Sequence, residues 1–359
     1  MSSAALVIFR VDAGISMGLG HLSRCLTLAA MLQASGARIL FLISPETALW
    51  SEKITSQDFG VRVLDVRGPN SMDGSPLAHS RWLPWGWAKD ADECLRLLPD
   101  EPTWLVADHY ALDEMWEKAM RPRVGKLMVI DDIADRRHCC DVLLDQNIKP
   151  KTSYENLVPL DCLTLIGPDY ALLRPDFLAE RRYERSGPAT RLNVFMGGTD
   201  REGATVRVLD ELGGGGLNWS RLDIILGSKC PHLETVRNRA AVLPNTRLHV
   251  DCEQVAGMFA SADLGIGAGG VASLERCCVG LPSIAISVAE NQNSGLAGLV
   301  DHGVIKFLGF LDGLSPGQIV ESVRCLMAEP GQLRRMSMQA LSLVDGLGAR
   351  RVAAAMLPG

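Results

Sequence analysis

Short apolar runs rich in branched residues alternate along this chain with longer stretches of helical pattern. Alternation of this kind builds parallel sheets that carry helices on both faces. In the first half, strands are expected at residues 6–9, 38–43, 61–64, 104–107, 127–130, 142–144 and 164–166, with a helix over 22–34. The pattern therefore predicts an α/β protein with doubly wound sheets.

A polar, arginine-rich stretch over residues 181–190 interrupts this alternation and is typical of a linker. The alternation then restarts, with strands expected at 191–196, 222–226, 247–250, 264–266 and 283–288 and a helical end from residue 318. A chain of 359 residues has room for two domains at roughly 100–200 residues each. We therefore expect two Rossmann-like domains facing a cleft, over residues 1–183 and 184–359.

Charge and cysteine usage limit the partners of such a chain. The net charge is −6 and no long basic cluster occurs, which argues against a nucleic-acid partner. The cysteines include the adjacent pairs Cys139-Cys140 and Cys277-Cys278, which rarely form disulfides, and no spacing matches a zinc site. No apolar run is long enough to span a membrane. We expect a cytoplasmic monomer with reduced thiols that uses no metal or other cofactor.

The first loop that follows a strand is a candidate catalytic segment, because open α/β sheets bind ligands at the carboxyl ends of their strands. This loop runs from Asp12 to His21 and contains Gly14, Gly18 and Gly20. Glycines let the backbone approach a ligand, and a positive helix end favours neutral imidazole over imidazolium. A neutral histidine that faces a cleft is a suitable general base. His21 is thus a candidate base, with a capping or packing role as the alternative.

Two further loops of the first half carry polar residues directly after expected strands. Asp108, His109 and Tyr110 follow the fourth strand, where polar residues are more often functional than in mid-helix, although a tyrosine there is as often structural. Asp131 and Asp132 follow the fifth strand. Paired carboxylates can bind Mg²⁺ or share a proton, but a helix cap with a local ion pair is the interpretation we favour.

The second half contains three loops suited to a nucleotide sugar. Residues 197–200 follow a strand and open a helix, a geometry that grips phosphate. Residues 265–270 hold four glycines in six positions, and packing alone hardly explains glycines that weaken regular structure. A pyrophosphate at the next helix start would explain them, and Glu275 either binds a ribose diol or complements the helix dipole. The amides and carboxylate of residues 289–293 suit sugar recognition or capping of the next helix.

Several motifs occur in one order along about residues 6–300: GLGHLSR, ADHY, VIDDIADR, LLDQN, GPDYALLRPDF, GGTD, GAGGVASLERC and AENQ. Together they resemble the GT-B-like nucleotide-sugar hydrolase family of pseudaminic acid biosynthesis. The resemblance implies hydrolysis of a UDP-linked 2,4-diacetamido-2,4,6-trideoxy sugar to free sugar and UDP. Water attacks the anomeric carbon with inversion, and no metal takes part. The product serves glycosylation of bacterial flagellin or surface glycans.

The resemblance also implies the roles of individual residues. His21 matches the base that activates water. The residues implied to contact the sugar are Gly20, Arg24, Tyr110, Asn291 and Gln292. Those implied to bind UDP are Gly197, Gly198, Thr199, Gly269, Gly270, Ser273 and the ribose-binding Glu275. The physical requirements agree, because glycine loops at helix starts stabilise a leaving diphosphate and neutral histidine deprotonates water.

The chain departs from the family pattern at two places. Val11-Asp12-Ala13 stands where a serine-rich run is expected after the aspartate, and the segment over residues 72–87, rich in Trp, Pro and Gly, has no counterpart. That segment is expected to form a lid or to shape a different sugar pocket. The same loops also suit a GT-B glycosyltransferase, a hydrolase of another UDP-amino sugar, a UDP-sugar 2-epimerase, or a silent nucleotide-sugar-binding protein.

Overall fold

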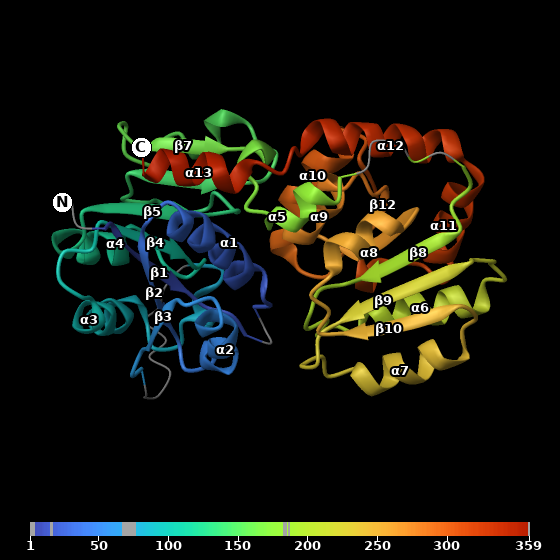
Figure 1. Cartoon of the computed structure of the whole chain (residues 1–359), viewed down its shortest axis with the longest axis horizontal. Coiled ribbons are helices and arrows are strands. Elements are labelled where there is room, and N and C mark those ends of the chain that lie inside the picture. Colours follow the sequence, from blue (N-terminus) through green and yellow to red (C-terminus); the bar gives the residue numbers. More distant parts are fainter. Residues whose placement is uncertain (1–3, 15–16, 67–76, 182–184, 186, 358–359) are drawn as a thin grey trace. The chain divides into compact units, whose positions relative to one another are not determined.

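The computed structural model describes residues 4–14, 17–66, 77–181, 185 and 187–357, apart from the side chains of residues 291 and 294 (Figure 1). The chain forms two compact units. Unit 1 is Met1–Leu172 together with Ala349–Gly359, and unit 2 is Leu173–Gly348. Each unit is built on one parallel sheet with its own helices.

Unit 1 contains a seven-stranded parallel sheet in the order β3-β2-β1-β4-β5-β6-β7. The strands are β1 (Leu6–Val11), β2 (Arg38–Ile43), β3 (Gly60–Val63), β4 (Trp104–Asp108), β5 (Lys126–Ile130), β6 (Val142–Asp145) and β7 (Leu163–Ile166). The α-helices are α1 (Gly20–Ala34), α2 (Ser51–Thr55), α3 (Trp87–Leu97), α4 (Glu114–Met120) and α13 (Gly348–Met356). Strand order reverses between β1 and β4, and ligands of open α/β sheets bind at such a point.

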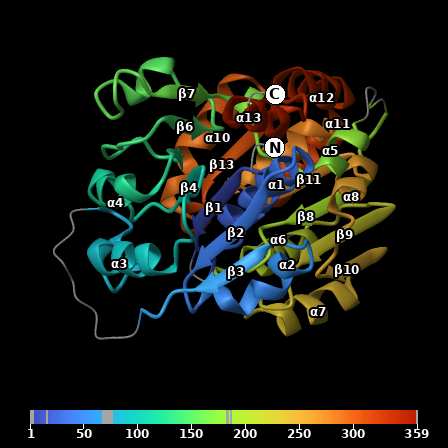
Figure 2. The ribbon, with the colours of Figure 1, turned by 60° about the vertical axis from the view of Figure 1, so that its left-hand side comes forward.

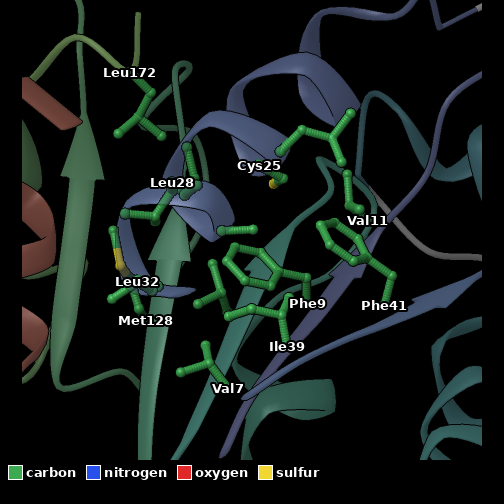
Figure 3. Packing of buried hydrophobic residues seen from close by; sticks show 14 of the residues in the cluster. Val7, Phe9, Val11, Cys25, Leu28, Leu32, Ile39, Phe41, Met128 and Leu172 are labelled. Carbon is green, nitrogen blue, oxygen red and sulfur yellow. The ribbon is translucent and has the colours of Figure 1, made fainter. Parts of the chain in front are cut away.

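Alternation along β1 sends its side chains to two cores on opposite faces of the sheet. Val7 and Phe9 pack with α1, and the Phe9 ring stacks on Phe41 of β2 with 4.9 Å between ring centroids (Figure 3). Leu6 and Ile8 belong to the other core, to which α3 and α4 contribute. Figure 2 shows α3 and α4 on the side of β1 away from α1. Both faces of this sheet are therefore covered by helices.

Unit 2 contains a six-stranded parallel sheet in the order β10-β9-β8-β11-β12-β13. The strands are β8 (Arg191–Phe195), β9 (Arg221–Leu226), β10 (Thr246–Val250), β11 (Leu264–Ala268), β12 (Ser283–Ser287) and β13 (Ile305–Phe310). The α-helices are α5 (Pro175–Ala179), α6 (Ala204–Gly214), α7 (Leu233–Val242), α8 (Val255–Ser261), α9 (Val271–Cys278), α10 (Asn293–Asp301), α11 (Gln318–Ala328) and α12 (Pro330–Leu343). Its strand order reverses between β8 and β11.

The α/β fold class and the expected strands are confirmed, but the domain limits need correction. The expected division at residues 183 and 184 lies beyond the structural division at Leu172 and Leu173, and residues 182–184 are outside the described part. The end of the chain does not stay with the second domain. Helix α13 joins unit 1, where Val352 and Met356 enter the core and the Trp104 indole donates to the Met356 carbonyl at 3.1 Å (Figure 1).

The cysteines and helices bear on two further expectations. All ten cysteines are free in the structure, and reduced thiols stay a prediction. None of the helices in the described part of the chain combines the length and apolar character that a membrane crossing needs.

Candidate active site

A histidine and an aspartate meet where the segments after β1 and β4 come together. His21 is the second residue of α1, and Asp108 is the last residue of β4. Nδ1 of His21 lies 2.6 Å from Oδ1 of Asp108, and both side chains are buried. An ionised carboxylate only accepts hydrogen bonds, so this contact favours a proton on Nδ1 over the longer approach of Arg24 Nη2 to the same nitrogen, at 3.2 Å. Nε2 is then the basic nitrogen of the ring.

The charge of Arg24 keeps Asp108 ionised. Burial would raise the pKa of Asp108, but the guanidinium of Arg24 and the ring of His21 hold this pKa well below its usual range. Nε and Nη2 of Arg24 each lie 2.6 Å from one oxygen of Asp108, which makes a bidentate ion pair. Nη1 of Arg24 donates to Asp132. Arg24 is buried with its N–H groups turned to carboxylates, and a direct sugar contact by this residue stays a prediction.

Tyr110 stands beside His21, with 4.6 Å between the ring centroids and 76° between the ring planes. Its hydroxyl donates to Oδ2 of Asp132 at 2.5 Å. Burial and the charge of Asp132 raise the pKa of Tyr110 well above its ordinary value, so the hydroxyl stays protonated. The neighbouring Asp131 accepts from Nη1 of Arg136 at 2.9 Å. Both aspartates thus pair with arginines, which confirms the expected ion pair. The expected helix cap is wrong, because no described helix lies between these aspartates and β6.

An aromatic wall lies next to His21. It consists of His79 and Trp82 from the Trp-rich segment and of Tyr110 from the loop after β4. Trp82 lies in the 3-10 helix η2 (Ser80–Trp82) and stacks on Tyr110, with ring centroids 5.6 Å apart and planes at 23°. Its ring lies edge-on to His21 at 6.1 Å, and His79 packs on it at 4.5 Å. Trp82 is half-buried. Part of the expected segment, residues 72–76, lies outside the described residues.

A buried carboxylate anchors this segment to the sheet. Oδ2 of Asp90 in α3 accepts from the Trp85 indole at 3.0 Å and from Nη2 of Arg10 at 2.6 Å. Oδ1 of Asp90 also accepts from the Trp116 indole at 3.0 Å. Arg10 is fully buried in the central strand β1. The ion pair between Asp90 and Arg10 therefore holds the start of α3 against the sheet. This contact positions the neighbouring Trp-rich segment beside His21.

His109 is placed differently from His21. Burial lowers the pKa of His109 to about 4, so the ring is neutral near pH 7. Its Nδ1 accepts from the Ala111 amide at 3.1 Å, and its Nε2 lies 3.5 Å from Oδ2 of Asp12. Both ring nitrogens of His109 thus face groups of the protein. Nε2 of His109 is buried and forms no hydrogen bond among the described residues. The hydrogen bonds of His21 to described residues involve its Nδ1.

The predicted UDP residues Gly197, Gly198 and Thr199 lie in the loop after β8. Gly197 has a φ of 101°, a conformation that favours glycine. The carboxylate of Asp200 accepts from the amides of Ala204 and Thr205, each at 2.9 Å, at the start of α6. These two amides are occupied, so any phosphate contact here would come from the backbone of the three predicted residues.

The loop after β11 brings four predicted UDP residues onto one helix start. Gly270 is exposed, with a φ of 84°, and precedes α9. Gly269 before it is buried, and Glu275 is half-buried on the helix. The Ser273 hydroxyl donates to the Ala268 carbonyl at 3.2 Å, which closes the loop on itself. Helix starts of this kind attract anions.

The loop after β12 reaches the loop after β11. A Cβ added at Gly269 would lie 2.9 Å from the Cβ of Gln292, so glycine is needed for this close approach. Oε1 of Gln292 accepts from the Val288 amide at 3.2 Å. Asn291 lies in the same 3-10 helix, η6 (Glu290–Gln292), and its side chain lies outside the described residues. The loops that carry the predicted UDP and sugar contacts of unit 2 therefore meet at one edge of the sheet.

The structure thus gathers His21, Arg24 and Tyr110 at one edge of unit 1, and Gly20 is exposed at the start of α1. Sequence reasoning assigned no function to Asp108, although its place at the end of a strand next to the switch point was an available signal. Trp82 lies in the segment expected to form a lid or to shape the sugar pocket, but nothing in the sequence singles this residue out. Among the described residues, no group of three or more acidic, histidine or cysteine side chains is arranged to hold a metal.

Comparisons with known proteins agree with this architecture. No family model matches the chain. It is 31% identical over 194 residues to the spore coat polysaccharide biosynthesis protein SpsG of Bacillus subtilis, across 52% of this chain and 56% of that protein, so the match spans about half of that relative. It is 27% identical over 263 residues to the UDP-2,4-diacetamido-2,4,6-trideoxy-beta-L-altropyranose hydrolase of Campylobacter jejuni, across 70% of this chain and 81% of that enzyme.

Among solved structures, MurG of Acinetobacter baumannii aligns with a TM-score of 0.65 at 17% identity, over 98% of this chain and 99% of that one. This likeness shows the fold, an α/β protein with two Rossmann-like units of the GT-B type. The similarity to the Campylobacter enzyme confirms the resemblance seen in the sequence motifs.

Proposed function

We propose that this protein is an inverting nucleotide-sugar hydrolase that works without a metal in the bacterial cytoplasm. Its substrate would be a UDP-linked 2,4-diacetamido-2,4,6-trideoxy sugar, cleaved to free sugar and UDP in pseudaminic acid biosynthesis. The observation that carries the proposal is the contact between His21 and Asp108, which leaves Nε2 of the histidine free to accept a proton. Sequence similarity to a hydrolase of such a UDP-sugar supports the substrate class.

In the proposed reaction, His21 acts on a water molecule. Nε2 takes a proton from the water while the water oxygen bonds to the anomeric carbon of the sugar. The bond from that carbon to the β-phosphate oxygen breaks, and its electron pair leaves with UDP. Attack from the face opposite UDP inverts the anomeric centre. The imidazolium that forms is stabilised by the carboxylate of Asp108, which stays ionised because of Arg24.

The leaving UDP is assigned to unit 2. Charge develops on the diphosphate as the bond breaks, and amides at a helix start stabilise such charge. The loop after β11 offers this geometry with Gly269 and Gly270, and Ser273 and Glu275 follow on α9. The backbone of residues 197–199 is the second proposed contact. Glu275 is proposed to bind the ribose.

The sugar is assigned to the edge of unit 1 around His21. Asn291 and Gln292 stay predicted sugar contacts from the sequence resemblance. Half-buried Trp82 presents ring surface there, backed by the buried ring of Tyr110. A trideoxy sugar has apolar C–H and methyl surface that packs on aromatic rings. Gly20 leaves open space beside the histidine, since no described atom lies within 4 Å of where its Cβ would be.

A glycosyltransferase is the second candidate, because the fold is shared with solved glycosyltransferases such as the calicheamicin glycosyltransferase CalG4. The two activities differ in the acceptor of the sugar. A hydrolase releases UDP in buffer alone, whereas a transferase needs an acceptor hydroxyl. UDP release from the diacetamido-trideoxy substrate by purified protein, without acceptor or added metal, tests the proposal. UDP-N-acetylglucosamine serves as the comparison that detects a hydrolase of another UDP-amino sugar.

A further inference from the structure

An arginine is buried in unit 2 without a carboxylate partner. Arg276 on α9 is 1% exposed. Its Nη2 donates to the Ala268 carbonyl at 2.8 Å and to Oγ of Ser273 at 3.0 Å. Nε and Nη1 are buried and have no hydrogen-bond partner among the described residues. The charge of the neighbouring Glu275 favours the cation, but no described carboxylate forms an ion pair with it. Burial lowers the pKa of Arg276 to about 10, so the guanidinium is still cationic at neutral pH.

Two glycines in the middle of β11 make room for this side chain. A Cβ added at Gly267 would lie 2.8 Å from Cζ of Arg276. One added at Gly265 would lie 3.2 Å from Cδ of Arg276, and nearer still to Oγ of Ser283 at 2.9 Å and Cδ2 of Leu281 at 3.0 Å. Neither glycine has a positive φ, so space and not backbone conformation requires glycine there. The glycine-rich run therefore has two parts. Gly265 and Gly267 admit the arginine, and only Gly269 and Gly270 belong to the loop.

A buried cation of this kind destabilises the ligand-free protein, because the hydration that it loses is offset only by a nearby opposite charge. The two glycines in the interior of β11 destabilise the protein further. The guanidinium is bonded to the carbonyl at the foot of the β11–α9 loop, and the amide end of α9 lies at the same loop. The arginine and the helix start thus both lie at this loop, and an anion bound there would add to the partial compensation that the charge of Glu275 provides.

We infer that Arg276 is a positioning residue for a diphosphate. It holds the Ala268 carbonyl and the Ser273 hydroxyl so that the loop keeps its shape, and its charge strengthens the field that the loop presents to the anion. The inference rests on the proposed function, because it takes the anion to be the diphosphate of UDP. Arg276 is therefore expected to affect the binding of the diphosphate and not the binding of the uridine.

The test compares Arg276→Met, which removes the charge but keeps a long side chain, with the wild type. Calorimetric titration gives the Kd for UDP and for uridine, and thermal unfolding gives the Tm of the ligand-free protein. We expect the Kd for UDP to rise by about tenfold or more, while the Kd for uridine is unchanged. The Tm should stay equal or rise, because a buried charge that is only partly compensated has been removed.

Arg181→Met is the matched control in the same unit. Arg181 donates to the Leu341 carbonyl at 2.9 Å and to the Cys278 carbonyl at 3.2 Å, at the ends of α12 and α9. This change should lower the Tm and leave the Kd for UDP unchanged. Arg276→Lys retains the charge and should keep most of the affinity for UDP.

An unchanged Kd for UDP in folded Arg276→Met protein would overturn the inference. So would an equal loss of affinity for UDP and uridine, or a loss that accompanies a lowered Tm, since either result indicates a structural role. A wild type that binds no UDP would refute the proposed function itself. A wild type that binds UDP but releases none from a UDP-sugar would refute the proposed hydrolase activity. The test of Arg276 would still apply, because it measures only the Kd for UDP and for uridine.

Discussion

Oδ1 of Asp108 lies 2.6 Å from Nδ1 of His21, although 87 positions separate the two residues in the sequence. The contact follows from the topology, because β1 and β4 are neighbours in the sheet. Side chains alternate along β4, and Asp108 lies on the face covered by α1, where it meets His21 and Arg24. The pair makes the histidine a base with a defined tautomer.

Changing Asp108 to asparagine tests this relationship. An amide can donate to Nδ1 and thereby favour the tautomer that has its proton on Nε2, so the base is lost. We expect kcat to fall by about 10²-fold or more with the Kd for UDP nearly unchanged. Asp113→Asn is the control, because Asp113 only caps α4 through the Met115 amide at 2.9 Å. Steady-state kinetics with near-normal turnover in Asp108→Asn would contradict the assignment.

Replacing His21 removes the proposed base directly. His21→Ala and His21→Asn should both lower turnover by about 10²-fold or more. UDP affinity should stay nearly intact, because the nucleotide is assigned to unit 2. Single-turnover kinetics and calorimetric titration measure the two quantities, and normal turnover in either variant would remove His21 from the mechanism.

The aromatic wall predicts a separate effect on the sugar. Trp82→Ala deletes the ring that stacks on Tyr110, and we expect kcat/KM for the UDP-sugar to fall by roughly tenfold. Trp82→Phe keeps an aromatic surface and should retain most of the activity, while the Kd for UDP should not change in either variant. An Ala variant with wild-type kcat/KM would show that the sugar does not use this ring.

Stability should decline at alkaline pH because of His138. Burial opposes the charge of His138, but the carboxylate of Asp131, 3.9 Å from Nε2, and the hydrogen bond to Glu117 at 2.7 Å raise the pKa of this histidine to about 9. Its folded pKa lies above the unfolded value of about 6.5, so its stabilisation is complete below that value. The stabilisation is lost as the pH rises to about 9, by at most about 1.4 kcal/mol of unfolding free energy per pH unit.

Denaturant titrations between pH 6 and 9 measure this slope. His138→Gln should flatten it, whereas His302→Gln, at an exposed position of unit 2, should keep it. An equal slope in His138→Gln protein would assign the pH dependence to other groups.

The sheets could be predicted because each strand is a local run of branched apolar residues. The pattern places β2 residue for residue over Arg38–Ile43. It misses β13, where Lys306 and Gly309 interrupt the apolar run. It also misses the return of α13 to unit 1, because the periodicity of a helix shows its apolar face but not the core that the face covers.

The site was predictable only in part, for the same reason. His21 is marked by its own loop, but the residues that position it lie on other strands and share no local pattern with it. In the sequence, the four glycines of residues 265–270 suggest a single phosphate loop. In the structure, Gly265 and Gly267 lie in β11 against neighbouring side chains that include Arg276, and Gly269 and Gly270 lie in the loop. The Trp-rich segment likewise depends on a non-local contact. Trp85 binds Asp90, and Asp90 pairs with Arg10, which lies 80 positions away in the sequence.

The central claim is that water, activated by His21, attacks the anomeric carbon of a UDP-linked diacetamido-trideoxy sugar. The most direct measurement is NMR of the anomeric protons while the purified protein acts on this substrate in ¹⁸O-labelled water, with mass analysis of both products. The account predicts an inverted anomer first, with the label in the sugar and none in UDP. Label in UDP, a retained anomer, or no UDP release without an acceptor would contradict it.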